Sequence, residues 1–161
     1  MEEIRYSPIG VIHSPFKEPK GVPIQPTAAK GVKGSVEVFE EYTEGLKDLE
    51  GFSHIILIYH FHLSKFFGLS VKPYMDENPH GVFATRAPSR PNSIGLSIIR
   101  LEKIEENFLF VEDIDIVEGT PVLDIKPFVP KFDIRDVDKI GWLDKNIQKL
   151  NNSKDDGRFL K

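Results

Sequence analysis

The residues best suited to bind an anion lie in one short stretch, TRAPSRPNSIGLS, at positions 85–97. Arg86 and Arg90 carry guanidinium groups, whose forked donors match phosphate and carboxylate oxygens. Pro88 and Pro91 fix their own φ angles, remove two backbone donors and bias the preceding residues toward extended backbone. The pattern predicts a stiff, irregular loop that presents two guanidinium groups in fixed positions. The alternative is a pair of solvated arginines beside an ordinary turn.

A second group of candidate residues comes from HIILIYHFHL at 54–63, an apolar and β-branched run that predicts a largely buried strand. His54, His60 and His62 occupy alternate positions and would share one face of that strand. A rise of about 3.3 Å per residue separates His54 from His60 by about 20 Å, so the three cannot share a metal ion. His60 and His62, about 7 Å apart, could share one, but no third ligand follows at a typical spacing. We therefore predict no metal site, and we expect these two histidines to line a pocket or a subunit contact.

Acidic residues form a third group near the end of the predicted strands. The stretch EGTPVLDIKP at 118–127 combines a tight turn with Asp124 and Lys126, which would share one face of a strand. These two residues could act at the mouth of a barrel, or they could form a surface ion pair of small energetic value. Asp113 and Asp115 also share a face, and we interpret that face as solvated.

Several well-known catalytic patterns are absent from the sequence. The chain has no cysteine, which excludes disulfides, thiolate metal ligands and cysteine nucleophiles. It has no GxSxG elbow, no GxxxxGK(S/T) loop and no GxGxxG after a predicted strand. A serine-hydrolase triad, a P-loop nucleotide site and a Rossmann cofactor site therefore have no support.

Short strands dominate the predicted elements, and few helices separate them. The predicted strands cover 9–14, 35–40, 54–63, 81–84, 94–104, 108–117 and a short run within 118–130. A short helix is predicted over 42–52, with Thr43 as its cap. No helix of about ten residues alternates with each strand, which argues against a doubly wound sheet. The predicted fold class is therefore mostly β, a small antiparallel β-barrel with short helices, of non-Rossmann type.

The chain is predicted to divide into a barrel domain at 1–130 and a C-terminal helical extension at 131–161. The stretch IRDVDKIGWLDKNIQKL at 134–150 has a helical repeat, with Asp136 as its N-cap. Its apolar residues, Val137, Ile140, Leu143, Ile147 and Leu150, fall on one side. We expect this helix to pack on the barrel or on another subunit.

Composition is that of an ordinary globular domain, with 161 residues, 40% hydrophobic and 29% charged. The net charge of −4 argues against a general basic nucleic-acid binder. The stretch at 14–34 nevertheless carries four lysines against one glutamate, a local balance of +3 that suits a specific RNA or a nucleotide. No apolar run approaches the roughly 20 residues that cross a bilayer, and the first residues lack a signal-peptide pattern. We expect a cytoplasmic protein without a membrane partner.

Four blocks of the sequence closely resemble the TsaA-like, or TrmO, family. They are PIGVIHSPFKEPKGVPIQP at 8–26, GFSHIILIYHFH at 51–62, GVFATRAPSRPNSIGLS at 81–97 and VEGTPVLDIKPFVP at 117–130. The resemblance implies a homodimeric β-barrel that binds S-adenosylmethionine (SAM) outside any Rossmann scaffold. It also implies methylation of N6 of threonylcarbamoyladenosine, the modified adenosine beside the tRNA anticodon. The alternatives are a SAM-dependent methyltransferase with another RNA or small-molecule substrate, and a non-catalytic module that binds SAM or RNA.

By matching positions, the resemblance assigns a set of residues to the cofactor: Pro26, Thr27, Ala28, His62, Leu63, Arg86, Leu96, Val117, Glu118, Gly119 and Thr120. Arg86 would hold the cofactor carboxylate, and Arg90 would act on a tRNA phosphate or on the threonyl carboxylate of the substrate. Asp124 is the candidate base. The chain departs from the family pattern at Thr27, where relatives often have Gly, and at Glu118, where they often have Asp. Ser89 and Ser93 also stand in place of a bulky residue and a second proline.

Overall fold

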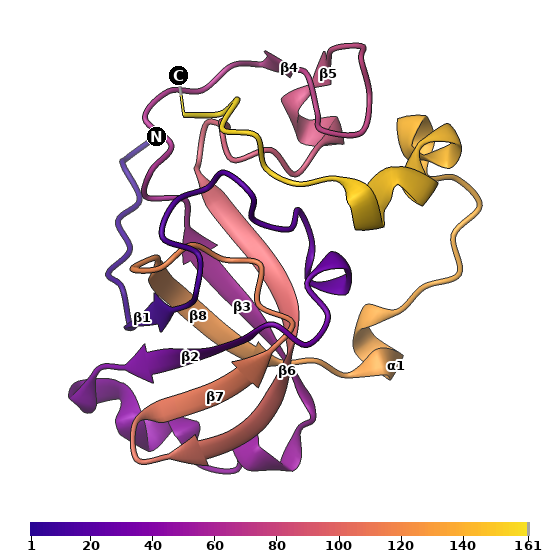
Figure 1. The fold of residues 1–161 in the computed structure, drawn as a ribbon. Helices are drawn as coiled ribbons and strands as arrows, with labels where there is room; N and C mark the ends of the chain where they lie inside the picture. Colours follow the sequence, from indigo (N-terminus) through magenta and orange to yellow (C-terminus); the bar gives the residue numbers. More distant parts are fainter. Residues whose placement is uncertain (161) are drawn as a thin grey trace.

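The computed structural model describes residues 1–160, and its centre is a closed antiparallel barrel (Figure 1). Six strands follow one another around it in the order β1-β2-β7-β6-β3-β8. Their bounds are Gly10–His13 (β1), Lys33–Val38 (β2), His54–His60 (β3), Ile94–Glu105 (β6), Phe108–Glu112 (β7) and Pro121–Pro127 (β8). A separate two-stranded sheet pairs β4, Ser70–Val71, with β5, His80–Gly81. The predicted fold class, a mostly β antiparallel barrel, is confirmed.

Regular alternation along the strands fills the barrel with largely aliphatic side chains. In β3, Ile55, Leu57 and Tyr59 are buried, and the residues between them face outward. β6 follows the same rule, with Ile99 and Leu101 inside. Burying one such side chain contributes roughly 1.5–3 kcal/mol, and a slip of one residue would turn all of them to solvent. The apolar pattern therefore fixes the register in which β3 and β6 pair.

The helices are short, and most of them are 3-10 turns. The α-helix α1 is Pro130–Asp133, and the 3-10 helices are η1 (Pro26–Ala28), η2 (Glu40–Leu46), η3 (Leu49–Gly51), η4 (Val82–Ala84), η5 (Gly141–Lys145) and η6 (Ile147–Asn152). The helix expected over 42–52 is split into η2 and η3, because Asp48 between them has a left-handed φ of 66°. Thr43 lies inside η2, so the N-cap expected there is wrong. None of the helices within residues 1–160 is long and apolar enough to cross a membrane.

Two predicted strands end early, and a third is largely replaced by a turn. β3 ends at His60, because the backbone turns at once and His62 N donates to His60 O at 2.8 Å. β7 ends at Glu112, because Asp113 adopts a left-handed φ of 66°. Of the strand expected over 81–84, only Gly81 is in a strand, as the last residue of β5, and η4 takes up the other three residues. All of these departures occur where the chain leaves the barrel toward one end.

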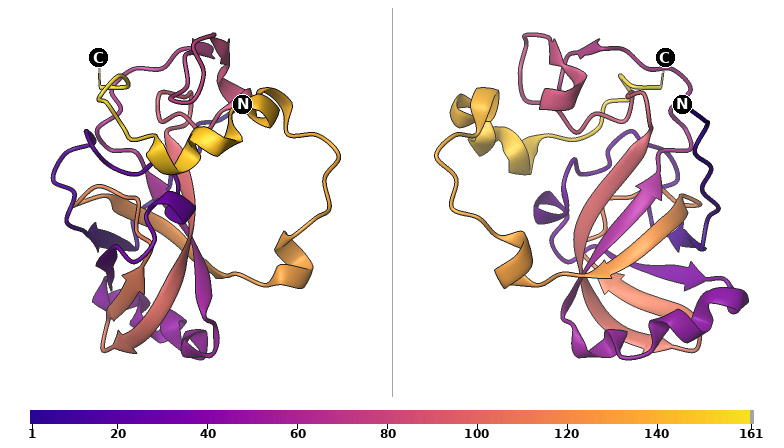
Figure 2. Two further views of the ribbon diagram at one scale, coloured as in Figure 1. Left: turned by 45° about the vertical axis from the view of Figure 1, so that its right-hand side comes forward. Right: turned by 180° about the vertical axis from the view of Figure 1, so that it is seen from behind.

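The single long helix expected over 134–150 does not form. Residues 134–140, which we call the arm, are all exposed and run away from the barrel as an extended arc (Figures 1 and 2). Gly141 has φ 58°, which a right-handed α-helix cannot accommodate, and only 3-10 turns follow. Val137 and Ile140 are exposed and line neither cavity, whereas Leu143, Ile147 and Leu150 line a cavity beside the barrel, although Ile147 is still 43% exposed. The helical repeat therefore combined residues from two different environments.

Residues 153–160, which we call the terminal strap, return to the end of the barrel. There they form hydrogen bonds with two of its loops. Asp155 N donates to Val22 O at 2.9 Å, and Gly21 N donates to Asp155 O at 2.6 Å. On the other side of the strap, Ser89 Oγ donates to Phe159 O at 3.3 Å. The strap thus lies between two loops that are far apart in the sequence (Figure 2).

Candidate functional site

Two cavities adjoin each other at the end of the barrel where the loops and the terminal strap meet. The first, which we call the barrel-end cavity, has a volume of about 470 Å³ and reaches Tyr59 inside the barrel. The second, which we call the extension cavity, has a volume of about 560 Å³ and lies between η1 and the inner side of η5 and η6. Gln25, Arg86 and Leu96 line both. Each volume is in the range of small-molecule sites, about 300–1,000 Å³.

The loop at 85–93 has no helix or strand, as predicted, and its own side chains brace it. Arg90 donates from Nη1 to Thr85 O at 2.9 Å and to Ala87 O at 3.3 Å. Thr85 Oγ1 donates to Val82 O at 2.8 Å and accepts from Ala87 N at 3.3 Å. These bonds, with the two prolines, hold the loop in one shape. Arg90 therefore supports the loop while it also lines the barrel-end cavity.

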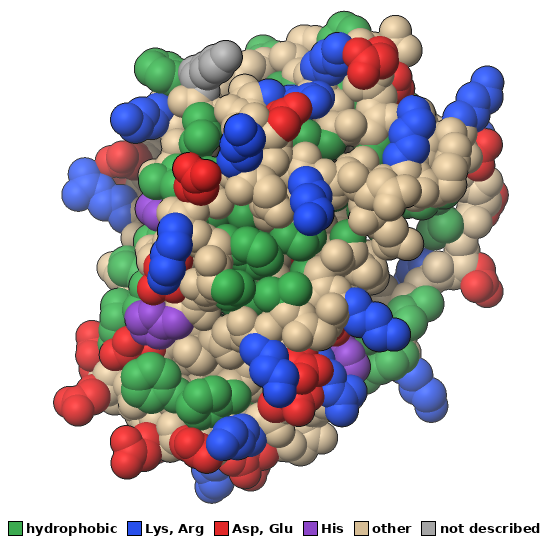
Figure 3. Space-filling model, viewed as in Figure 1, with side chains coloured by type: hydrophobic (Ala, Val, Ile, Leu, Met, Phe, Trp, Pro, Cys, Tyr) green, Lys and Arg blue, Asp and Glu red, His purple; other side chains and the backbone are tan. Residues whose placement is uncertain are grey.

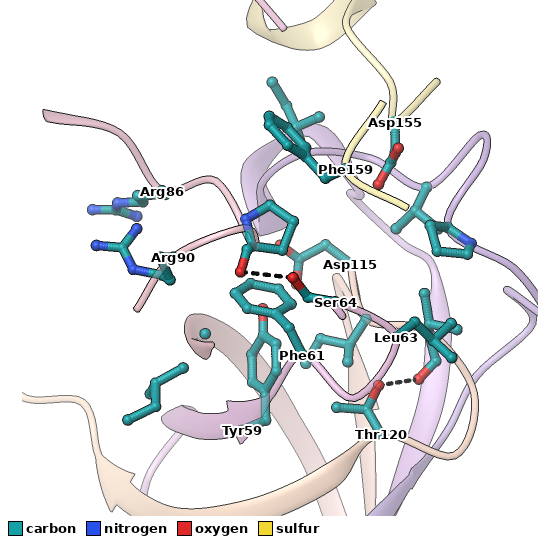
Figure 4. Close-up of a pocket in the computed structure, with 18 of the residues that line it drawn as sticks. Tyr59, Phe61, Leu63, Ser64, Arg86, Arg90, Asp115, Thr120, Asp155 and Phe159 are labelled. Atoms are coloured by element: carbon teal, nitrogen blue, oxygen red, sulfur yellow. Dashed lines mark hydrogen bonds between the residues drawn. The ribbon is translucent and has the colours of Figure 1, made fainter. Parts of the chain in front are cut away.

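Arg86 connects this loop to the long proline-rich loop at 15–34. Its Nη1 donates to Gln25 Oε1 at 2.9 Å, and its side chain lies on the border of both cavities. The Arg86 and Arg90 guanidinium groups lie at the same edge of the barrel-end cavity (Figure 4). Two neighbouring guanidinium groups at a cavity edge favour an anionic ligand.

The turn that precedes β8 contributes a second wall. Gly119 adopts φ 76°, a conformation that favours glycine, and Thr120 Oγ1 donates to Val117 O at 2.7 Å. Val117 and Thr120 line the barrel-end cavity. The Glu118 carboxylate points elsewhere and accepts from Ser14 N at 2.6 Å, a bond that lowers the pKa of Glu118. Glu118 thus anchors the turn to the chain after β1.

The end of β3 supplies the third wall. His62 and Leu63 line the barrel-end cavity, and the Thr120 hydroxyl lies 3.4 Å from His62 Nδ1. Burial, and then the neighbouring His60, lower the pKa of His62, so its imidazole is neutral at pH 7. His60 itself is exposed at the strand end. Within residues 1–160, no three His, Asp or Glu side chains are arranged to hold a metal ion.

The predicted cofactor residues divide between the two cavities. His62, Leu63, Val117 and Thr120 line the barrel-end cavity, Pro26 and Thr27 line the extension cavity, Arg86 and Leu96 line both, and Ala28, Glu118 and Gly119 line neither. The lining positions come from four segments that are separated in the sequence. The fold therefore brings together most of the residues that the resemblance assigns to one ligand.

Asp124, the candidate base, lies away from both cavities. It is on β8 opposite Ile58, and its half-exposed carboxylate forms an ion pair with Lys126 at 2.7 Å. It is not among the residues that line either cavity. This geometry favours the surface ion pair that the spacing of Asp124 and Lys126 left open.

A different carboxylate, missed in the sequence, opens on the barrel-end cavity. Asp115 accepts from Ser97 Oγ at 2.7 Å, and the Tyr59 hydroxyl lies 3.0 Å from the same Ser97 oxygen. Because Ser97 gives its proton to Asp115, Tyr59 donates to Ser97. Burial raises the pKa of Asp115 to about 7, although the Ser97 hydrogen bond opposes the shift. The interpretation of Asp113 and Asp115 as one solvated face is wrong, because the strand ends at Glu112.

Comparison with known proteins identifies the family of the chain. Residues 11–134 match the family model described as the tRNA-methyltransferase O N-terminal domain. The chain belongs to the TrmO family. It is 65% identical, over 157 residues, to a probable S-adenosyl-L-methionine-binding protein of Pyrococcus abyssi, covering 98% of this chain and 85% of that protein.

Two further TrmO-family relatives are longer than this chain. A tRNA (adenine(37)-N6)-methyltransferase of Homo sapiens is 35% identical over 133 residues, which are 78% of this chain and 30% of that protein. The crystal structure of TrmO from Pseudomonas aeruginosa superimposes with a TM-score of 0.74 at 39% identity, covering 89% of this chain and 64% of that one. The chain therefore spans less than two thirds of these two relatives.

In this TrmO-family member the terminal strap completes the barrel-end cavity. Asp155, Phe159 and Leu160 line it, and in Figure 4 Phe159 lies across the cavity from Tyr59. Burial raises the pKa of Asp155. The sequence gives little sign of this wall, because the strap carries no apolar repeat, although Phe159 packs on the cluster of Val71, Val82 and Ala87.

Proposed function

We propose that this TrmO-family chain is a SAM-dependent tRNA methyltransferase that acts on N6 of threonylcarbamoyladenosine beside the anticodon. The observation that carries the proposal is the convergence of most family-assigned cofactor residues on two adjoining cavities. Relatives named as SAM-binding proteins and tRNA methyltransferases support the same class of reaction. The proposal includes a cytoplasmic location, because tRNA is the substrate.

The residues that line the cavities suit the chemical parts of SAM. Arg86 donates one hydrogen bond to Gln25, and its other guanidinium N–H groups suit the methionine carboxylate. Leu63, Leu96 and Val117 offer apolar surface to an adenine ring. SAM would supply an activated methyl group on a sulfonium. The chain's own contribution is to orient the reactants and exclude water, which can lower a barrier by several kcal/mol.

A basic loop beside the cavity supports a tRNA partner. The lysine-rich loop at 15–34 also supplies Pro19 and Val22 to the barrel-end cavity, so its charges lie at the cavity's border. Lys20 and Lys30 are exposed. On the face shown in Figure 3, several Lys and Arg side chains, with Asp and Glu side chains among them, surround apolar side chains at the centre. A phosphate backbone would meet this ring while one base enters the cavity.

We infer that the chain works as a homodimer, and exposed apolar residues support this. α1 and the residue after it expose Phe132 by 75% and Ile134 by 58%, and neither lines a cavity. Exposed apolar side chains that lie close together in this way mark interaction sites. Light scattering should give twice the chain mass for the wild type and the monomer mass for Phe132→Lys.

A non-catalytic SAM-binding role is the second candidate, because the Pyrococcus relative is named only as a probable binding protein. One experiment decides between the two. Threonylcarbamoylated, unmethylated tRNA is incubated with the chain and SAM, and anticodon-loop nucleosides are measured by mass spectrometry. A mass gain of one methyl on the modified adenosine supports the methyltransferase. Calorimetric SAM binding without that gain supports the binding module, and gain on tRNA lacking the threonylcarbamoyl group indicates a different substrate.

A further inference from the structure

The carboxylate of Asp115 stands at the inner end of the barrel-end cavity and is joined to the barrel interior by hydroxyl groups. Ser97 is 1% exposed and Tyr59 is 4% exposed, and both belong to inward positions of strands whose other inward residues are mostly aliphatic. A buried hydroxyl costs about 1–3 kcal/mol unless it is hydrogen-bonded. The Tyr59–Ser97–Asp115 chain satisfies both hydroxyls, but aliphatic side chains would fill the same positions without that requirement. The three polar groups thus link the barrel interior to the Asp115 carboxylate at the cavity.

We propose that Asp115 is the catalytic base that accepts the proton released when the substrate nitrogen is methylated. The inference rests on the proposed function and replaces Asp124 in that role. The substrate nitrogen forms a bond to the methyl carbon, and the carbon–sulfur bond breaks with its electron pair on sulfur. The N–H proton passes to Asp115, and solvent takes it when the product leaves.

The geometry of the hydrogen-bond chain suits this role. Ser97 donates to Oδ1 of Asp115, which leaves Oδ2 for a group in the cavity. Tyr59 fixes the Ser97 hydroxyl, and the Tyr59 ring is itself fixed against Gly95, where a Cβ atom would collide with it. A base held in one orientation within hydrogen-bond reach of its proton is what general-base catalysis requires.

The groups around Asp115 agree with a proton acceptor that works near neutral pH. Burial brings the pKa of Asp115 to about 7, and the Arg86 guanidinium favours its charged form. Burial raises the pKa of Tyr59 and lowers that of His62, so both are neutral at pH 7. The other carboxylate in the cavity, Asp155, accepts from Gly157 N at 2.7 Å and belongs to the terminal strap, whereas Asp115 is held from the barrel strands by Ser97 and Tyr59. Asp115 is thus the best-matched base among the described cavity residues.

The test compares Asp115→Asn with the wild type and with the matched control Asp124→Asn. Single-turnover methyl transfer to threonylcarbamoylated tRNA should fall by about a hundredfold or more in Asp115→Asn. Calorimetric SAM affinity should stay within about threefold, and Asp124→Asn should keep the wild-type rate within about threefold. A full rate in Asp115→Asn would overturn the assignment and leave the proposed function standing. A wild-type chain that binds SAM but transfers no methyl would overturn both.

If Asp115→Asn fails to fold, the variant Ser97→Ala and an NMR titration of the wild-type carboxyl groups still test the proposal. Ser97→Ala keeps the carboxylate and removes a hydrogen bond that lowers its pKa, so the rate-versus-pH curve should move to higher pH. Carboxyl-carbon NMR on the full chain, with the Asp115 signal assigned by its shift in Ser97→Ala, should show one aspartate titrating near neutral pH. Titration of Asp115 at the usual pH of about 4 would contradict the proposal, as would an unmoved curve in Ser97→Ala.

Discussion

The barrel and the C-terminal region build the same cavities by opposite means. The barrel holds its share of the lining on strands whose inward side chains are almost fully buried. The region after α1 has only 3-10 turns and an exposed arm, and its strap is held by hydrogen bonds and by Phe159, which packs on a small apolar cluster outside the barrel. Local stability follows buried apolar contact and hydrogen bonding. The comparison teaches that one wall of the site belongs to the main core, whereas the wall opposite it depends on a smaller and separate set of contacts.

The largest effect should come from a cavity in the barrel core. Leu57→Ala truncates a fully buried side chain and should lower the free energy of unfolding by about 2–5 kcal/mol, measured in urea. Val137→Ala in the arm is the matched control, because its side chain is 67% exposed. It should change the free energy of unfolding by less than about 0.5 kcal/mol. Equal losses in both variants would show that the arm is as tightly packed as the core.

Deletion of residues 153–161 should separate folding from binding. The barrel keeps all of its core residues in this variant, so it should still unfold cooperatively. The barrel-end cavity loses Asp155 and Phe159, and SAM affinity should fall by about tenfold to a hundredfold, or 1.4–2.8 kcal/mol. Calorimetry and urea unfolding check the two expectations. Wild-type affinity in the deletion variant would show that the strap is not a wall of the cofactor site.

The two loop arginines should differ in what they affect. Arg86→Ala should weaken SAM binding by about tenfold or more, about 1.4 kcal/mol, because it removes the guanidinium shared by both cavities. Arg90→Ala should leave calorimetric affinity nearly intact and impair tRNA methylation, because Arg90 braces the loop and faces one cavity only. If Arg90→Ala abolished cofactor binding alone, this division of roles would be wrong.

The smallest expected effect concerns His13, which contacts the turn that precedes β8. His13 lies 2.8 Å from Glu37 and 3.2 Å from Glu118, and these hydrogen bonds, that of Glu37 first, raise its pKa above 6.5. The folded state therefore binds the proton more tightly than the unfolded state. The stabilisation is complete below pH 6.5 and is lost as the pH rises through the raised pKa.

Unfolding experiments above and below pH 6.5 should detect a loss of about 0.2–1 kcal/mol, the range for partly exposed ion pairs. His13→Asn should flatten this pH dependence. The control is His54→Asn, because the recorded partner of His54 is the neutral Ser53 hydroxyl. The same flattening in His54→Asn would assign the effect to histidines in general.

The parts of the fold that follow from local sequence pattern were predictable. Alternating apolar residues identified the barrel strands, and Pro88 and Pro91 identified the irregular loop with its two arginines. The parts that depend on single backbone angles were not. Asp113 leaves the ordinary φ range and ends β7, and Gly141 has a positive φ within the stretch where the apolar repeat predicted one continuous helix.

Site residues were predictable only where they belong to a recognisable sequence motif. Resemblance placed Arg86, His62 and Thr120 around one cavity, as the fold does. Asp115 was assigned to a solvated face, because one assumed strand ran through 108–117 and the true strand stops at Glu112. Its partner Ser97 gave a usable signal, since it occupies an inward position of an apolar strand. The strap's contribution required three-dimensional structure, because no periodic pattern marks it.

The exposed arm has a practical consequence for comparing members of this family. The family match ends at residue 134, where the arm begins, and no barrel strand lies beyond that point. Chimaeras joined there would exchange everything after the barrel and leave each strand partner in place. If the proposed function holds, a panel of such hybrids, each with a different tail on this barrel, would show which part of the chain sets the preference among tRNAs.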